Sequence, residues 1–157
     1  MHTDFELRRT TTADADFQKL VQALDNELWN ELKEDQATYD PHNKVSGIKT
    51  AVVIYSFEDP VACGCLKPFD KETVEIKRMF VQKGYRRKGL SKAVLTELER
   101  WAVEEGYRRA VLETSVHFKT ARNLYRKSGY EVVANYSPYV GLMESICMSK
   151  DLQKEKA

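Results

Sequence analysis

One stretch decides the fold. It reads TVEIKRMFV (73–81), then QKGY (82–85), then RRKGLS (86–91). Its first part predicts a β-strand over 73–81, because β-forming and apolar residues gather there without an interrupting Gly or Pro. Gly84 marks a turn, and apolar residues at helical spacing from Leu90 to Ala102 predict a helix that begins near Arg87.

The joint between this strand and this helix is strongly cationic. No acidic residue lies between Val81 and Thr96, and the basic side chains are Lys83, Arg86, Arg87, Lys88 and Lys92. The first N–H groups of a helix have no intrahelical acceptor and the helix dipole adds positive potential, so the joint is a candidate anion site. A solvated basic turn before a surface helix is the competing interpretation, because short glycine motifs also arise by chance.

The composition is that of an ordinary globular protein. The chain has 157 residues, 42% hydrophobic and 31% charged, with a formal net charge of +1. We expect a single domain over 1–157 and no nucleic-acid partner, because nucleic-acid-binding domains usually carry a clear basic excess. The sequence has no bilayer-length apolar run and no secretory pattern, so we expect a cytoplasmic protein without a membrane segment. The three cysteines fit neither a disulfide framework nor a zinc site, so no metal is expected.

Hydrophobic periodicity along the rest of the chain predicts alternating strands and helices. Strands are expected over 5–9, 48–57, 61–66, 73–81, 109–114, 130–134 and 144–148. Helices are expected over 17–32, from Arg87 to Gly106 and over 118–128, with a short helix and loop over 30–47. This order predicts an α+β fold with a mixed, mostly antiparallel sheet of about seven strands flanked by about four helices.

Two motifs together resemble one known family. The first, Arg86-x-x-Gly89-x-Ser91, resembles the pyrophosphate loop of the GNAT N-acetyltransferases, written Gln/Arg-x-x-Gly-x-Gly/Ala, from which Ser91 departs. The second, Ala121-x-x-Leu124-Tyr125-x-x-x-Gly129-Tyr130, resembles the family's later motif of Ala, Leu-Tyr and Gly-Phe/Tyr. The element order also matches over nearly the whole chain. The resemblance implies the GNAT (acyl-CoA N-acyltransferase) fold, within a bacterial subgroup of unassigned acceptor.

This resemblance implies acetyl-CoA as donor and an N-acetyltransferase that moves the acetyl group to a primary amine by direct attack. The amine would belong to a small molecule or a peptide. The pyrophosphate would rest on the N–H groups of 87–91, and the pantetheine arm would pair with the strand ending at Val81. The implied cofactor-binding residues are Met79, Phe80, Val81, Arg86, Arg87, Lys88, Gly89, Leu90, Ser91 and Asn123.

Tyr125 and Glu75 are the predicted catalytic residues. A phenol with a pKa near 10 is protonated at neutral pH, so Tyr125 is the acid for the leaving thiolate. Glu75 is the base, although an ordinary glutamate is weak for this task and needs burial or a water relay. Glu113 on the next strand is the reserve base. The competing interpretations are a packed core tyrosine and a solvated strand carboxylate.

Four aromatic residues are candidates for the wall of the acceptor site: Trp29, Tyr39, Tyr136 and Tyr139. They suit a small cationic or amide-bearing acceptor, although each one alone is more often a surface or core packing residue. His42 is a weaker base candidate because no partner for it is visible. The alternatives are an acetyl-CoA-binding regulatory domain without turnover, and an RNA-contacting module, which the near-neutral charge disfavours. The sequence leaves the acceptor's identity and a homodimer open.

Overall fold

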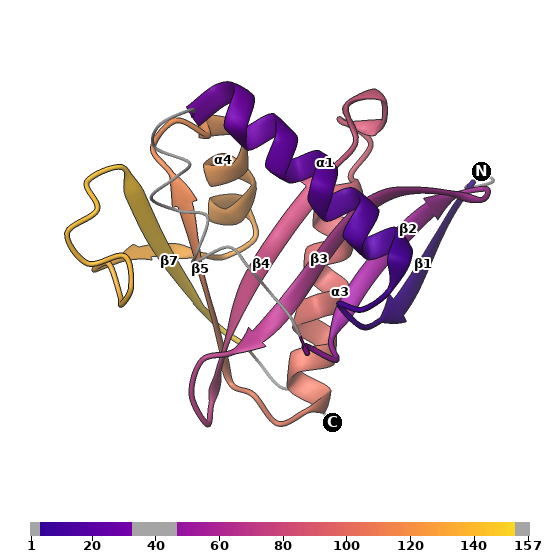
Figure 1. Cartoon of the computed structure of the whole chain (residues 1–157). Helices are drawn as coiled ribbons and strands as arrows, with labels where there is room; N and C mark the ends of the chain where they lie inside the picture. The colour runs from indigo at the N-terminus through magenta and orange to yellow at the C-terminus, as the bar shows by residue number, and fades with distance from the viewer. Residues whose placement is uncertain (1–3, 33–46, 153–157) are drawn as a thin grey trace. The chain divides into compact units, whose positions relative to one another are not determined.

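The computed structural model describes residues 4–32 and 47–152, coloured in Figure 1 from indigo at the N-terminus to yellow at the C-terminus. The chain first runs through β1 (Phe5–Thr10), α1 (Ala15–Leu32), β2 (Ala51–Ser56), β3 (Asp59–Pro68) and β4 (Thr73–Val81). It then runs through a 3-10 helix η1 (Lys83–Tyr85), α3 (Leu90–Glu104), β5 (Arg109–Ser115), α4 (Lys119–Lys127), β6 (Glu131–Val133) and β7 (Ser145–Asp151).

The strands belong to one seven-stranded sheet with the order β1-β2-β3-β4-β5-β7-β6. β4 and β5 pair in parallel, whereas β1–β2, β2–β3, β5–β7 and β6–β7 are antiparallel. The predicted α+β fold with a mixed, mostly antiparallel sheet is therefore confirmed. The described residues hold three α-helices and one 3-10 helix, and the short helix expected over 30–47 falls largely on residues outside them.

The described residues form two compact units. The first contains the chain up to Lys67 together with Lys77–Leu98, and the second contains Pro68–Ile76 and the chain from Glu99 onward. β4 and α3 each contribute residues to both units. Each unit is described by itself below.

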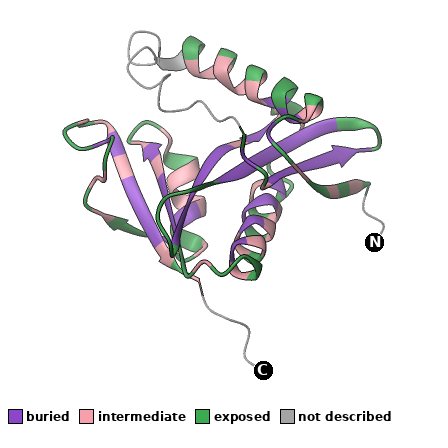
Figure 2. Ribbon diagram, turned by 60° about the horizontal axis from the view of Figure 1, so that its bottom comes forward, coloured by how far each residue is buried: buried purple, intermediate pink, exposed green. Residues whose placement is uncertain are grey.

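In the first unit, helices cover both faces of the strands. Phe17 and Leu20 of α1 pack in a core cluster with strand side chains from Ala51, Val53, Tyr55, Cys63, Cys65 and Phe80. Gly64 points to the opposite face, where a Cβ would meet Met79 Sδ at 2.6 Å and Val94 Cγ1 of α3 at 2.9 Å. Successive strand residues alternate between faces, so α1 and the start of α3 lie on opposite sides of β3. Figure 2 shows β2 and β3 buried along nearly their whole length.

The start of α1 is fixed by Asp14. Its Oδ1 accepts hydrogen bonds from the backbone N–H groups of Asp16 at 2.8 Å and Phe17 at 3.1 Å. These are N–H groups that the helix itself leaves without an acceptor. Asp14 therefore caps the N-terminus of α1.

In the second unit, strand register places two carboxylates on one face of the sheet. Glu75 of β4 is paired with Val111 of β5, and Glu113, two residues further along β5, is paired with Cys147 of β7. Directly paired residues project to the same face, and so do residues two apart on one strand. Glu75, Glu113 and Cys147 therefore share a face.

The predicted start of the helix at Arg87 is wrong. Arg87 has φ 66° and Gly89 has φ 78°, both in the left-handed region, and α3 begins only at Leu90. An L-residue in this conformation cannot continue a right-handed helix. The other predicted strands and helices in the described ranges are present, with boundaries displaced by a few residues. Cys63, Cys65 and Cys147 are all buried free thiols.

Candidate active site

The loop before α3 has the geometry of an anion site. Two left-handed residues, Arg87 and Gly89, bring the chain sharply into the helix. The Ala93 N–H donates to the Gly89 carbonyl at 3.1 Å, so the N–H groups of 90–92 precede the first intrahelical hydrogen bond. Nothing lies within 4 Å of a Cβ built on Gly89, and Arg87 and Lys88 are exposed. An open, cationic helix N-terminus is a favourable place for a phosphate group.

The side chain of Arg86 is fixed by hydrogen bonds and an ion pair within the first unit. Its Nε donates to the Val81 carbonyl at 2.8 Å, and its Nη2 donates to both Glu27 carboxylate oxygens at 2.8 and 3.0 Å. The guanidinium carbon lies 5.7 Å from the centre of the Phe80 ring. The structure thus brings Arg86, Phe80 and Val81 together. A phosphate contact of Arg86 stays a prediction, and its partner Glu27 carried no signal in the sequence.

The strand residues predicted to line the pantetheine arm turn their side chains into the protein. Phe80 is 8% exposed and belongs to the core cluster with α1, and Val81 is 7% exposed. The sulfur of Met79 lies against Gly64. A ligand beside this strand would therefore contact its backbone rather than these side chains.

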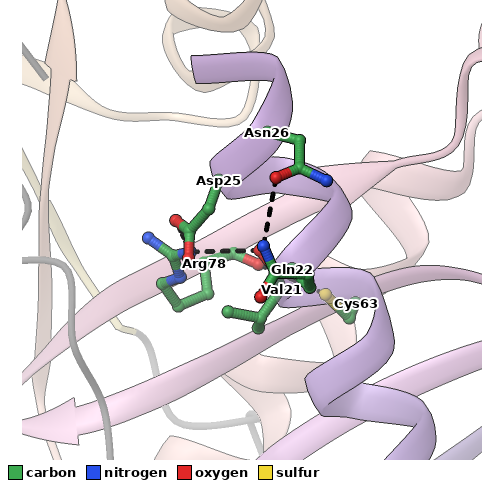
Figure 3. A network of polar contacts seen from close by, with 6 residues as sticks. All are labelled: Val21, Gln22, Asp25, Asn26, Cys63 and Arg78. Atoms are coloured by element: carbon green, nitrogen blue, oxygen red, sulfur yellow. Dashed lines mark hydrogen bonds and ion pairs between the residues drawn. The ribbon is translucent and has the colours of Figure 1, made fainter. Parts of the chain in front are cut away.

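Arg78, in the middle of β4, has an unusual environment that the sequence did not reveal. It is a non-glycine residue with φ 60°, and its side chain is only 3% exposed. Figure 3 shows its guanidinium directed at Asp25 of α1, with which it forms an ion pair, while Nη2 also donates to the Val21 carbonyl. The Cys63 thiol donates to the Arg78 carbonyl at 3.4 Å. These contacts fasten α1 to β4 in the first unit.

In the second unit, the predicted base Glu75 is hydrogen-bonded to Tyr136, a residue predicted to line the acceptor site. The Tyr136 hydroxyl donates to Glu75 Oε2 at 2.9 Å, and Glu75 is 6% exposed. The Tyr136 ring packs edge-on against Phe69 at 5.1 Å and Tyr139 at 5.6 Å between centroids. Burial, and then the charge and hydrogen bond of Glu75, raise the pKa of Tyr136 far above its usual value.

Tyr125, the predicted acid, lies on α4 and is 8% exposed. Burial, with a smaller contribution from the charge of Glu113, raises the pKa of Tyr125 to about 12. Its ring packs edge-on against Tyr130 at 6.0 Å, and the Tyr130 hydroxyl donates to Glu99 Oε2 at 2.8 Å. Tyr125 is therefore a phenol that stays protonated at neutral pH.

The reserve base Glu113 is half-buried and accepts a hydrogen bond from the Ser145 hydroxyl at 2.8 Å. Burial raises the pKa of the Cys147 thiol to about 11; a backbone hydrogen bond from Tyr136 opposes this, and the charges of Glu113 and Glu75 add to it. Both carboxylates therefore act on the same thiol. Glu75, Glu113, Tyr136 and Cys147 form one polar cluster in the second unit, called the Glu75 cluster below.

The other predicted residues are more scattered. Asn123 is half-buried on α4, and Trp29 on α1 is 43% exposed. Tyr139 is 1% exposed and packed like a core aromatic residue. Tyr39 and His42 lie outside the described residues. Their roles in binding stay predictions.

Two observations bear on metal and membrane. Among residues 4–32 and 47–152, no three His, Cys, Asp or Glu side chains lie together as a metal site would require. No helix in the described ranges combines the length and apolar character needed to cross a bilayer.

Comparison with known proteins identifies the family. The family model described as "Acetyltransferase (GNAT) family" matches residues 14–130. "Probable N-acetyltransferase 14" of Xenopus tropicalis is 39% identical over 90 residues, which are 57% of this chain and 44% of that protein. "Uncharacterized N-acetyltransferase YsnE" of Bacillus subtilis (strain 168) is 34% identical over 97 residues, covering 60% of this chain and 64% of that protein. The matched part thus spans less than two thirds of either relative.

Solved structures give the same answer for the fold. A protein of Klebsiella pneumoniae assigned to the acyl-CoA N-acyltransferases matches with a TM-score of 0.79 and 25% identity, over 95% of this chain and 98% of that one. The PaiA N-acetyltransferase of Thermoplasma acidophilum, solved in complex with coenzyme A, has the same fold, with a TM-score of 0.68 and 15% identity over 95% and 99% of the two chains. From its loop geometry, its strand order and the match over 14–130, this chain belongs to the acetyltransferase (GNAT) family.

Proposed function

We propose that the protein is an N-acetyltransferase that moves the acetyl group of acetyl-CoA to a primary amine by direct attack. The acceptor would be a small molecule or a peptide amine. The observation that carries the proposal is the loop before α3, where left-handed Arg87 and Gly89 present the helix N-terminus to an anion. Family membership supplies the kind of anion, the diphosphate of coenzyme A.

The loop would hold the cofactor through backbone N–H groups and local charge. The N–H groups of 90–92 donate, and the exposed Arg87 and Lys88 add positive potential. Since the side chains of Phe80 and Val81 are buried, β4 would contribute its backbone, and the Phe80 N–H is the candidate donor to the thioester oxygen. The bound cofactor supplies an activated acyl group as a thioester.

Tyr125 would assist departure of the thiolate. With a pKa of about 12, its phenol remains protonated across the usual assay range and can donate to the sulfur. An ordinary thiol has a pKa near 8.5, below that of Tyr125, so Tyr125 would stabilise the leaving thiolate mainly by a hydrogen bond and not by full proton transfer. Burial of the sulfur would raise its basicity and favour transfer of the proton. Tyr125 is thus proposed as the donor that stabilises the leaving group.

Glu75 would receive the proton that the acceptor nitrogen loses. It is a buried carboxylate, and a carboxylate offers about four acceptor positions, so the bond from Tyr136 does not exhaust its capacity. Trp29, Tyr136 and Tyr139 remain the proposed aromatic contacts of the acceptor. Glu113 is the alternative base.

The test is release of coenzyme A thiol with a panel of primary amines, using the full chain and the variant Gly89→Glu. A side chain at φ 78° is strained, and a carboxylate there repels phosphate, so coenzyme A affinity should fall by at least about tenfold. The matched control is Gly106→Glu, because Gly106 also has positive φ and open space but lies beyond α3.

Turnover on one or more amines, with loss of affinity in Gly89→Glu alone, would support the proposal. Normal coenzyme A affinity in Gly89→Glu would contradict the placement of the diphosphate. Tight coenzyme A binding without turnover on any amine would favour the regulatory domain instead.

A further inference from the structure

Arg78 combines a strained backbone with a buried charge in the middle of β4. The left-handed non-glycine residues of the described chain are Phe57, Arg78 and Arg87, and of these Arg78 alone lies within a strand. An L-residue is strained in this conformation because its Cβ lies too close to the following carbonyl oxygen. Strain of this kind persists only where surrounding contacts hold it, and it is concentrated at functional sites.

Two neighbouring elements hold this residue in place. On the side of α1, the guanidinium forms an ion pair with Asp25, visible in Figure 3, and Nη2 also donates to the Val21 carbonyl at 3.4 Å. On the side of β3, the Cys63 thiol donates to the Arg78 carbonyl at 3.4 Å. All four residues belong to the first unit. The side chain and the carbonyl of the left-handed residue are therefore each tied to another element.

The ion pair is a costly way to hold a helix on a sheet. The Arg78 side chain is 3% exposed and that of Asp25 is 34% exposed. The Nε of Arg78 is buried and has no hydrogen-bond partner among the described residues. Desolvation of a charged group and an unsatisfied donor both oppose folding, so a buried pair of this kind is weak evidence for a stabilising role. This observation favours a role beyond packing.

The backbone that follows Arg78 carries the proposed donor to the thioester oxygen, the Phe80 N–H. A residue with unusual dihedral angles bends a strand and changes the direction of the groups after it. The ladder between β4 and β5 covers Thr73–Glu75, and Arg78 follows it in the chain. The left-handed conformation therefore lies between the regular part of β4 and the proposed donor.

We propose that Asp25 is a positioning residue, which acts through its ion pair with Arg78 to hold β4 in the left-handed conformation that directs the Phe80 N–H. The consequence for the thioester rests on the proposed function, whereas the hold of Asp25 on the backbone does not. Without Asp25, residue 78 would relax toward extended backbone, and the N–H groups after it would change direction. A misaligned donor is of little use because electrostatic stabilisation depends on donors that are already aimed at the developing charge.

A comparison of glycine with alanine separates the backbone of residue 78 from its charge. Arg78→Ala removes the guanidinium and keeps the Cβ that disfavours the left-handed region, whereas Arg78→Gly removes both. In an ordinary strand glycine is less stable than alanine, so the proposal predicts the reverse order at position 78. The matched control is Arg8 in β1, a strand arginine of the same unit that pairs with Glu6 at 2.9 Å and is not left-handed.

Thermal unfolding of the full chain tests this order. Arg78→Gly should unfold about 2–4 °C above Arg78→Ala, because only glycine adopts the required conformation without strain. Arg8→Gly should unfold below Arg8→Ala. The ordinary order at position 78, with alanine the more stable, would overturn the inference.

NMR of the full chain labelled with carbon-13 and nitrogen-15 at arginine follows the backbone of residue 78 directly. The Cα chemical shift and the coupling between the amide and α protons report φ, and Arg78→Gly assigns the signal by removing it. In Asp25→Ala both quantities should move toward those of extended backbone. Asn26→Ala is the control, because Asn26 lies exposed beside Asp25 and accepts a hydrogen bond from Gln22 at 3.0 Å. An unchanged signal in Asp25→Ala, or an equal change in Asn26→Ala, contradicts the role of Asp25.

Release of coenzyme A thiol, measured in parallel, separates this inference from the proposed function. We expect kcat to fall about tenfold in Asp25→Ala and Arg78→Ala and by less in Arg78→Gly. The KM for acetyl-CoA should stay the same, because the loop before α3 is untouched.

Equal losses of kcat in Arg78→Gly and Arg78→Ala, or full kcat in Asp25→Ala despite a shifted NMR signal, would reject the positioning role alone. The expected NMR change in Asp25→Ala, without turnover of any amine by the unchanged protein, would support the hold of Asp25 on the backbone and reject the N-acetyltransferase.

Discussion

The loop before α3 and the Glu75 cluster are built in opposite ways. The loop is one contiguous run, 86–91, whose proposed binding groups are backbone N–H donors and whose conformation depends on Arg87 and Gly89. The Glu75 cluster consists of side chains from separate strands and a loop, and its central hydrogen bond joins residues 61 positions apart. The loop is open and charged, whereas the cluster is buried or half-buried and hydrogen-bonded.

This difference teaches which kinds of site tolerate substitution. A backbone site depends on the dihedral angles that the residues can adopt, so most side chains of the loop can change if the glycine stays. A buried polar cluster depends on each partner, because removing one leaves another without its hydrogen bond in a medium of low polarity. Single-atom deletions should therefore have large effects in the cluster and small ones in the loop.

The largest expected effect tests the second unit. Tyr125→Phe removes one hydroxyl from a buried phenol, and loss of a positioned acid typically lowers the rate by about a hundredfold or more. Steady-state kinetics should show this loss in kcat, while calorimetry should show unchanged coenzyme A affinity. Tyr107→Phe, at a half-buried tyrosine in the turn after α3, is the control. A kcat within about threefold of the unchanged protein would remove Tyr125 from the mechanism.

The next effect tests the packing beneath Met79 in the first unit. Gly64→Ala places a Cβ 2.6 Å from Met79 Sδ and 2.9 Å from Val94 Cγ1, so the free energy of unfolding should fall by about 1–3 kcal/mol. Urea denaturation measures the change. Gly84→Ala, where nothing lies within 4 Å, should be nearly neutral. Equal stability of the two variants would show that α3 yields to the added methyl group.

A smaller effect tests the N-terminal cap of α1, the helix whose carboxylates form ion pairs with Arg78 and Arg86. Burial alone would raise the pKa of Asp14, but bonds from the Phe17 N–H, the Thr10 hydroxyl and the Asp16 N–H hold the pKa of its carboxyl below the usual value. Asp14→Ala should cost about 1 kcal/mol at neutral pH.

The sign of the pH dependence follows from this lowered pKa. The ionised cap stabilises the folded state fully above about pH 4, and the advantage is lost as pH falls through the lowered folded-state pKa. Thermal unfolding of the unchanged protein and Asp14→Ala should therefore converge in acid. Asp14→Asn keeps a capping oxygen without a charge, so it should lose less stability than Asp14→Ala at neutral pH. The stability difference between Asp14→Asn and Asp14→Ala should not disappear in acid. An advantage that grew in acid would contradict the role of the ionised carboxyl.

The smallest expected effect concerns Arg86. Glu27→Gln weakens a partly exposed ion pair and makes the guanidinium more available to phosphate, so coenzyme A affinity should rise about threefold. Titration calorimetry at low salt measures this change, and Glu58→Gln at the exposed turn between β2 and β3 is the control. A loss of affinity in Glu27→Gln would instead mean that this ion pair shapes the loop for its ligand.

Much of the fold could be predicted because hydrophobic periodicity is local. Strand β4 was expected over 73–81 and is observed there, and the parallel pairing with β5 follows from a strand, a helix and a strand in succession. The start of α3 was missed because the left-handed Arg87 has no signature of its own, unlike Gly89. The left-handed Arg78 was missed for the same reason, since the tertiary contacts with Asp25 and Val21 hold it.

The sequence by itself predicted an anion site at 86–91, because a glycine and several basic residues fall within one short run and set its local charge. It also named Tyr125, Glu75 and Tyr136. Only the tertiary structure decided what these residues contact. The bond from Tyr136 to Glu75 and the grouping of Glu113 with Cys147 depend on strand register. Register is set by pairing between distant segments, so no local pattern of residues can encode it.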